Sequence, residues 1–310
     1  MVSALVLVLL AAMAVGVPIA ASLGLASVSA LLVQGRLPLT LVPQRIYVGL
    51  DSFPLLAAPL FILAGALMES GGISLRITHL AQALVGHVRG GLGMVVVVGT
   101  MLFSGISGSS TADTAAIGSV MIPTMVRRGY SPEFATAVVA AAGGMGILIP
   151  PCIIMVIYGL LTNTSIAALF LGGVIPGLIM GATVLGATYW MARRQNLPVE
   201  TAFSPRELGR SVRRAGWALL MPAIIMGGIL FGVVTVTEAA VLAVVYGGFV
   251  AVFIYRELRW RDLPRIFAES GVITGLVMLV VGMASVFGWI LTSQQVPLAV
   301  ATAFAAISSS

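Results

Sequence analysis

The chain has 310 residues, of which 59% are hydrophobic and only 8% are charged. About a quarter of the residues in a soluble domain are charged, so this composition excludes a soluble globule, and its hydrophobicity excludes an intrinsically disordered chain. The formal charge of +6 does not indicate nucleic-acid binding, because all 16 cations are arginines in short islands between apolar runs. We therefore expect a membrane protein.

The first part of the chain, residues 1–90, is predicted to form scaffold helices and an interfacial arm helix. Residues 2–16 and 18–33 are two short apolar spans, separated by a turn because proline begins a helix more readily than it continues one. A polar connection leads to a third span at 53–68. Residues 74–88 are amphipathic and are predicted to lie in the membrane interface, with His79 and His87 solvated or facing headgroups.

The central part, residues 91–165, is predicted to be a core of the kind found in transporters. In 91–128 two short apolar pieces flank the polar run GISGSSTADTAAIG, and neither piece would comfortably span a membrane alone, which favours a re-entrant helical hairpin. Residues 132–162 are predicted to form a discontinuous helix that is broken at AAGGMGILIPP. Glycine tolerates unusual dihedral angles there, and proline has no N–H to donate.

The last part, residues 166–310, is predicted to hold a connecting helix and an incomplete second repeat. The connecting span covers 166–191 and leads into a basic polar loop at 193–214. The further spans are 218–234, 238–255 and 271–291, followed by a weakly amphipathic segment at 296–307. Thr237 is expected to cap the span that opens at Glu238.

The order of these elements suggests two inverted repeats. An odd number of crossings separates the repeats, which is typical of secondary transporters with broken helices. The predicted fold class is an all-α polytopic membrane protein, an inverted-repeat elevator-type transporter with a re-entrant hairpin and a discontinuous helix.

The arginines predict the orientation of the chain. If each span changes sides and the hairpin returns to its own side, 14 arginines lie on one side and only Arg36 and Arg45 on the other. The positive-inside rule makes the arginine-rich side cytoplasmic. The N-terminus is then periplasmic, and the hairpin enters the membrane from the cytoplasm.

Two groups of residues are candidates for binding. The hairpin tip offers oxygen atoms suited to Na⁺ or to a polar substrate, although the same residues could simply cap a helix: Ser107, Ser109, Ser110, Thr111 and Asp113. The helix break frees backbone carbonyls, although a simple proline kink is the alternative: Gly144, Gly146, Ile149, Pro150 and Pro151. Transporter sites form where two discontinuous helices face each other.

An enzyme is not expected. The sequence GISG at Gly105–Gly108 fits an intramembrane serine protease, which is kept as a remote alternative. A nucleophilic serine needs a histidine base within hydrogen-bond reach, and neither histidine lies in a predicted span. A phosphate-binding loop of the GxxxxGK[ST] type would need a lysine, which the sequence does not contain.

The central block, GISGSSTADTAAIG followed by MIPTMVRRGYSPEFATAVVAAAGGMGILIPP, resembles the large membrane subunit (DctM- or SiaM-like) of tripartite ATP-independent periplasmic (TRAP) transporters. GVPIAASLGLA and VTVTEAAVLAVVYG fit the same family. The resemblance implies a Na⁺-driven elevator in the bacterial inner membrane that imports a C4-dicarboxylate or a sialic-acid-like carboxylate. A periplasmic substrate-binding protein and a small DctQ-like membrane subunit would be its partners, and Na⁺ as coupling ion its only cofactor.

Within this resemblance the tip residues match the first hairpin motif, and the break residues match the first unwound helix. The resemblance implies one Na⁺ between them, held by Ser107, Ser110, Gly144 and Pro150. Cys152 stands where the family commonly has serine. The family's second hairpin and second unwound helix are missing, so we expect a C-terminally truncated chain that does not transport alone. The nearest alternative is a single-component Na⁺/dicarboxylate or citrate symporter of the same superfamily, which needs no binding protein.

Overall fold

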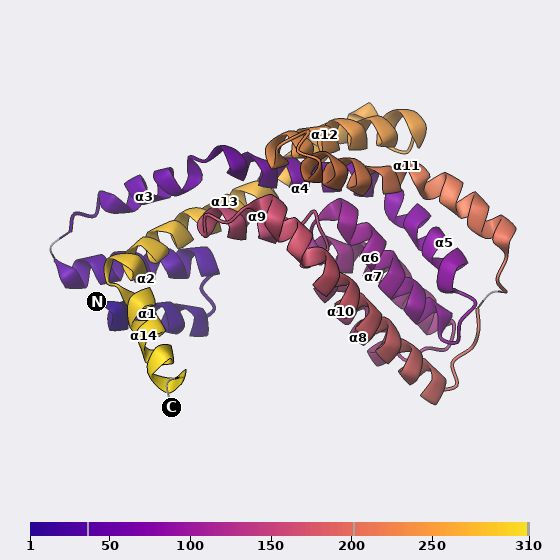
Figure 1. The fold of residues 1–310 in the computed structure, drawn as a ribbon, viewed down its shortest axis with the longest axis horizontal. Helices are drawn as coiled ribbons and strands as arrows, with labels where there is room; N and C mark the ends of the chain where they lie inside the picture. The colour runs from indigo at the N-terminus through magenta and orange to yellow at the C-terminus, as the bar shows by residue number, and fades with distance from the viewer. Residues whose placement is uncertain (36, 201, 309–310) are drawn as a thin grey trace. The chain divides into compact units, whose positions relative to one another are not determined.

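The computed structural model describes residues 1–35, 37–200 and 202–308, and the regular elements of these residues are helices (Figure 1). The predicted all-helical class is confirmed. Five helices are long and apolar enough to cross a membrane, namely Phe53–Ser70, Ile166–Arg194, Pro205–Leu230, Val236–Ile254 and Trp260–Ser293. The chain forms two compact units, Pro54–Gly271 and Met1–Phe53 with Val272–Ser310. The predicted division at residues 90 and 165 follows the repeats and stays a prediction.

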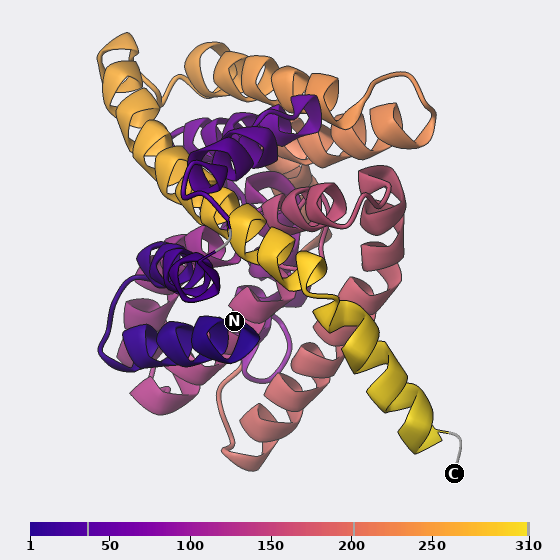
Figure 2. The ribbon, with the colours of Figure 1, turned by 90° about the vertical axis from the view of Figure 1, so that its left-hand side faces the viewer.

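The unit that contains the N-terminus is built on a pair of short helices. Helices α1 (Val2–Ala14) and α2 (Ile19–Gln34) pack against each other, with Pro18 at the start of α2 as predicted (Figure 1). Figure 2 shows the long α13 (Leu263–Ser293), which belongs to this unit from Val272 onward, followed by α14 (Val296–Ser308). The core of the unit consists of Leu5, Ala26, Ala30, Leu31, Val286 and Ile290.

The predicted polar connection between the second and third spans is wrong, because residues 41–50 form a helix, α3 (Leu41–Leu50). Val42 and Ile46 of α3 pack against the core of this unit. The polar residues around Val42 and Ile46 led the sequence analysis to predict a loop instead of a helix with an apolar face.

The larger unit contains the hairpin and the broken helix. The arm helix α5 (Ile73–Val85) contacts α6 (Gly91–Ser107) and α11 (Pro205–Leu230). Figure 1 shows α6, α7, α8 and α10 side by side, and buried apolar residues from all four helices form one core. The remaining bounds are η1 (Phe53–Leu56), α4 (Ala57–Ser70), α7 (Ser110–Arg127), α8 (Pro132–Met145), α9 (Ile153–Leu161), α10 (Ile166–Arg194), α12 (Val236–Phe249), the π-helical turn η2 (Val250–Ile254) and η3 (Trp260–Asp262).

The predicted basic loop at 193–214 is wrong in its second half. Helix α11 begins at Pro205, and the hydroxyl of Ser204 accepts the backbone N–H of Glu207 at 3.4 Å. A serine cap, a proline in the first turn and an early acidic residue together start a helix. The arginines after residue 205 therefore lie on a helix that continues into the apolar part of α11.

The cap of α12 also differs from the prediction. Thr235, not Thr237, is the N-cap, and it forms a capping box with Glu238. The backbone N–H of Thr235 donates to the Glu238 carboxylate at 2.7 Å, and the Glu238 N–H donates to the Thr235 hydroxyl at 3.3 Å. The acidic residue three positions after the cap is typical of this motif.

An extended segment, residues 198–200, closes the open end of the hairpin. Val199 forms an antiparallel bridge with Arg89, and the N–H of Gly90, just before α6, donates to the carbonyl of Pro198 at 3.1 Å. At the end of α7, Arg128 forms an ion pair of 3.6 Å with Glu200, whose side chain is 5% exposed. We call this segment the strap. It holds both arms of the hairpin at their base.

Candidate ion-binding site

The turn of the hairpin is two residues long. Gly108, with φ +64°, ends α6, and Ser109 caps α7 by accepting the N–H of Ala112 at 3.4 Å. A side chain on Gly108 would be strained by this dihedral, and its Cβ would also lie 2.7 Å from the carbonyl oxygen of Pro151. The turn therefore requires glycine, and the tip lies directly against the break between α8 and α9.

A buried carboxylate joins the two arms of the tip. Asp113, in the first turn of α7, has no exposed surface, and it accepts hydrogen bonds from the hydroxyls of Ser104 and Ser107 on α6. The Ser107 hydroxyl in turn accepts the N–H of Ser109 at 3.1 Å. Within residues 1–35, 37–200 and 202–308, no arginine or histidine forms an ion pair with Asp113. The hydroxyls solvate the carboxylate, but no side chain there neutralises it.

The tip and the break are joined by backbone carbonyls. The hydroxyl of Ser110 donates to the carbonyl of Gly143 at 2.6 Å, and the N–H of Ile153 donates to the carbonyl of Gly108 at 3.1 Å. Helix α8 ends at Met145, and α9 begins at Ile153, so the chain between them is not α-helical. The predicted discontinuous helix is confirmed, and it faces the hairpin tip.

Gly146 touches the carboxylate directly. A Cβ built on it would lie 2.7 Å from Oδ2 of Asp113 and 3.0 Å from Oγ of Ser104. No real side chain fits at these distances without moving its neighbours. Gly146 therefore lies beside Asp113 and Ser104, and its predicted part in binding stays a prediction.

The other predicted break residues divide between the tip and α10. The carbonyl oxygen of Pro150 lies near Gly105 of α6, and the carbonyl of Pro151 lies near Gly108. The side chain of Ile149 instead packs against Gly177 of α10. Gly144 faces Met180 of α10, with 3.8 Å between its Cβ position and the terminal methyl group. The structure thus brings the carbonyl of Gly143, rather than Gly144, to Ser110.

Two of the tip residues are directed away from the carboxylate. The hydroxyls of Ser109 and Thr111 lie 3.1 Å apart, and Thr111 is exposed. Ser109 acts as the helix cap, which confirms the capping interpretation for that residue. Ser107, Ser110 and Asp113 remain as the tip side chains that lie inward.

Sequence reasoning missed two participants, Ser104 and Gly65, and it placed Gly143 in the break without naming it as a site residue. Ser104 lies one turn before Ser107 on the same face of α6, so the spacing of three residues was a usable signal. Gly65 of α4 lies against the tip backbone, with its Cβ position 3.0 Å from the Ser107 carbonyl oxygen. Gly65 is distant in sequence, and no local pattern indicates it.

The protease alternative has no catalytic geometry. The Ser107 hydroxyl donates to Asp113, and among the described residues no histidine is its hydrogen-bond partner. His79 and His87 both lie on the arm-helix side of the unit and line a separate cavity. Ser107 therefore lacks the base that a serine nucleophile needs.

The sequence was compared with known families once this geometry was clear. Residues 6–310 match the family described as "Tripartite ATP-independent periplasmic transporter, DctM component". The chain belongs to this family. The family predicted from the sequence is confirmed. The chain is a multi-pass protein of a bacterial inner membrane.

Three relatives illustrate the similarity. A C4-dicarboxylate TRAP transporter large permease protein of Pseudomonas aeruginosa is 45% identical over 252 residues, covering 81% of this chain and 59% of the relative. An isethionate TRAP transporter permease protein, DctMQ, of Oleidesulfovibrio alaskensis is 40% identical, with coverages of 95% and 47%. A sialic acid TRAP transporter permease protein of Haemophilus influenzae is 36% identical, with coverages of 98% and 49%. The chain spans about half the length of these curated relatives.

Proposed function

We propose that this chain is part of the large membrane subunit of a Na⁺-coupled TRAP transporter that imports a small organic acid. The substrate class, a C4-dicarboxylate or a sialic-acid-like carboxylate, is supported by the names of the relatives, which transport C4-dicarboxylates, isethionate or sialic acid. The small DctQ-like subunit is a proposed partner, and the relative named DctMQ supports it. A periplasmic binding protein is the other proposed partner, in keeping with the family description. The arginine-rich side faces the cytoplasm in this proposal.

The observation that carries the Na⁺ proposal is the buried carboxylate of Asp113. An unpaired charge in an apolar interior is costly, and a bound cation removes most of that cost. The atoms around Asp113 are hydroxyl oxygens and the carbonyls of an interrupted helix, which are the hard ligands that Na⁺ accepts. Asp113, Ser107 and Ser110 would hold the ion with carbonyl oxygens of the Gly143–Pro151 segment.

The start of α7 supports a carboxylate as the transported group. The first N–H groups of a helix have no partner within it, and the helix dipole favours an anion at that end. Ser110 and Thr111 supply two such N–H groups beside the proposed cation site. A substrate carboxylate would gain from both, and movement of the hairpin unit against the scaffold helices would carry ion and substrate together.

Thermal unfolding of the purified protein in NaCl, compared with KCl at equal ionic strength, tests the ion site. At a Na⁺ concentration about tenfold above its dissociation constant, linkage predicts a stabilisation of about 1.4 kcal/mol. We expect Asp113→Asn to abolish the difference between the two salts, because asparagine has nearly the same shape but no charge. Its amide oxygen can still accept from one serine hydroxyl, while its NH2 group can only donate to the other. Ser110→Ala should weaken the difference.

Ser119→Ala is the matched control for these variants. Ser119 lies on α7 outside the tip, and its hydroxyl bonds only the Ala116 carbonyl in the same helix. The control should keep the full response to Na⁺. Equal unfolding temperatures of the unaltered protein in NaCl and KCl, over the whole range of salt concentrations, would disprove the ion site.

Uptake by proteoliposomes tests the transporter class. The protein is reconstituted with a small DctQ-like membrane subunit and given a labelled organic acid, with and without a periplasmic binding protein. Na⁺-dependent uptake that requires the binding protein supports the tripartite proposal. Uptake that proceeds without it favours the single-component symporter.

A further inference from the structure

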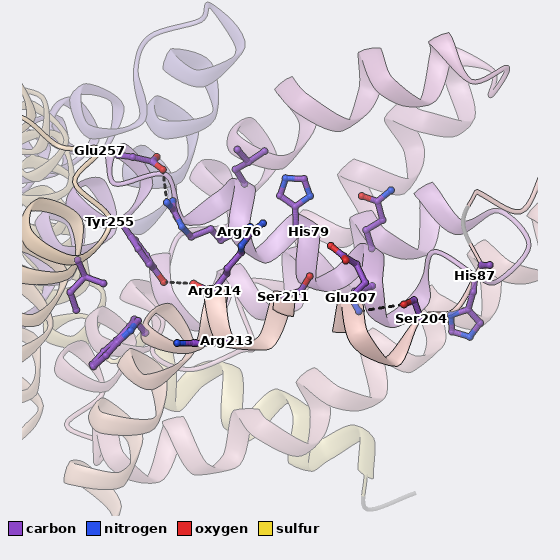
Figure 3. Close-up of a pocket in the computed structure, with 16 residues that line it drawn as sticks. Arg76, His79, His87, Ser204, Glu207, Ser211, Arg213, Arg214, Tyr255 and Glu257 are labelled. Carbon is purple, nitrogen blue, oxygen red and sulfur yellow. Dashed lines mark hydrogen bonds and ion pairs between the residues drawn. The ribbon is translucent and has the colours of Figure 1, made fainter. Parts of the chain in front are cut away.

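A cavity of about 890 Å³ lies on the larger unit among α5, the start of α11 and the chain after α12 (Figure 3). It shares no residue with the hairpin-tip site. Figure 3 shows arginines and Tyr255 gathered at one end and His87 with Ser204 at the other. The family assignment and the proposed transport mechanism leave this cavity unexplained.

The cavity carries an excess of positive charge. Arg76, Arg213 and Arg214 line it together with two acidic residues, Glu207 and Glu257. Glu257 is already paired with Arg76 at 2.5 Å. Glu207 is paired at 3.0 Å with Arg210, which does not line the cavity.

Arg213 and Arg214 are the cations that remain unmatched. Neither forms an ion pair among the residues that the structure describes. The cavity therefore has about two unmatched positive charges, and His79 and His87 add ring nitrogens along its length. Guanidinium groups bind phosphate in a forked geometry, which makes a phosphate group the chemistry that this surface fits.

The cationic end of the cavity is held in place before any ligand binds. The hydroxyl of Tyr255 donates to the backbone carbonyl of Arg214 at 2.9 Å and accepts the N–H of Ala218 at 3.2 Å. The guanidinium of Arg76 lies over the ring of Tyr255, 3.9 Å from its centre. These contacts fix α11 at Arg214 and Ala218 against the segment after α12, so a ligand there does not have to order the backbone.

An apolar stripe continues from the cavity along α11. Residues 213, 217, 220 and 224 follow spacings of four, three and four, so they lie on one face of the helix. The exposed fractions are 47% for Trp217, 46% for Leu220 and 39% for Ile224. This face therefore passes from a cation to an aromatic ring and then to exposed aliphatic side chains. The order matches an amphiphile that lies across a membrane interface.

We propose that this cavity binds the phosphate of an anionic phospholipid at Arg213 and Arg214, with an acyl chain along Trp217, Leu220 and Ile224. Free phosphate has the same chemistry as the headgroup, but it would make no contact with the apolar stripe. Basic pockets between helices at the membrane surface are suited to such headgroups. Bound lipid would fasten the arm helix α5 to α11.

Native mass spectrometry of the full chain in detergent tests the proposal. The probes are dioleoyl phosphatidylglycerol, dioleoyl phosphatidylcholine, glycerophosphoglycerol and inorganic phosphate, each titrated separately. We expect phosphatidylglycerol to bind in preference to phosphatidylcholine. Replacement of both arginines, Arg213→Gln with Arg214→Gln, should weaken it about 25-fold, from about fivefold per arginine.

The matched control removes two arginines from elsewhere. Arg259→Gln with Arg261→Gln lowers the net charge equally, and both residues are exposed and lie outside the cavity. This variant should bind phosphatidylglycerol as the unaltered protein does, and both double variants should show unchanged thermal unfolding in lipid-free detergent.

Three results would overturn the lipid assignment. They are equal binding of the two phospholipids, equal loss in both double variants, and binding of inorganic phosphate or glycerophosphoglycerol as tight as that of the intact lipid. If Arg213→Gln with Arg214→Gln unfolds, Leu220→Asn with Ile224→Asn becomes the deciding variant. It should weaken phosphatidylglycerol while leaving binding of glycerophosphoglycerol unchanged, and unchanged lipid binding would contradict the proposed acyl-chain position.

Discussion

Replacement of Gly146 by alanine is the sharpest test of the tip geometry. The backbone of Gly146 has φ −59° and ψ −20°, which alanine adopts without strain, so any effect arises from the added methyl group alone. That methyl group would lie 2.7 Å from Oδ2 of Asp113 and 3.0 Å from Oγ of Ser104. Neither neighbour can turn away freely, because Asp113 and Ser104 are hydrogen-bonded to each other in a buried site.

The expected cost follows from overpacking. Inserting a methyl group into a tightly packed interior costs about 1–3 kcal/mol. For a unit of this size that corresponds to a decrease in Tm of roughly 3–9 °C. The measurement is thermal unfolding of the purified protein in detergent, followed by tryptophan fluorescence.

Gly144→Ala is the matched control. Its Cβ would meet only the flexible end of Met180 at 3.8 Å, and alanine favours the last turn of α8 by up to about 1 kcal/mol. We therefore expect Gly144→Ala to leave Tm unchanged or raise it slightly. If Gly146→Ala has the same Tm as the unaltered protein while Gly144→Ala has a lower Tm, the assignment of the two glycines to opposite faces is refuted.

Two further predictions concern the ends of the hairpin. Gly108→Ala should lower Tm by more than Gly129→Ala. Both glycines have positive φ, but of the two only Gly108 has a carbonyl oxygen within 3 Å of its Cβ position. Equal decreases in Tm would mean that backbone strain alone causes the effect and that the contact with Pro151 does not contribute. Burial and then the charge of Glu200 raise the pKa of Tyr130 to about 12. Stability contributed by the neutral phenol is therefore complete below pH 10 and lost as pH rises towards 12. Tyr130→Phe should show a smaller loss of Tm between pH 10 and 12.

Long apolar runs and breaker residues were enough to predict most of the helices. The predicted boundaries were wrong where polar residues suggested a loop. This happened at α3, which contains Gln44 and Arg45, and in the first turns of α11, which contain Arg206 and Arg210. The signals at Ser204, Pro205 and Glu207 were present, but the charge of the segment outweighed them in the prediction.

The site was predictable only in its local part. Asp113 and the serines lie within one short run, so composition alone marked them. The partners that shape the site come from other helices, such as Gly65 on α4 and the carbonyl of Gly143 on α8. Such contacts depend on tertiary packing, and a glycine that is required by a neighbour's approach has no pattern of its own.

The strap restrains the two arms of the hairpin at their base. Its three residues come four positions after the end of α10 at Arg194, and they hold the start of α6 through Arg89 and Gly90 and the end of α7 through Arg128. The two arms therefore cannot splay apart at their base without breaking these bonds, and α10 also packs against α6 and α8. The base of the hairpin is therefore tied to α10 through a turn of only three residues, so any motion that separates the two arms there must first break the bridge at Arg89 or the ion pair at Arg128.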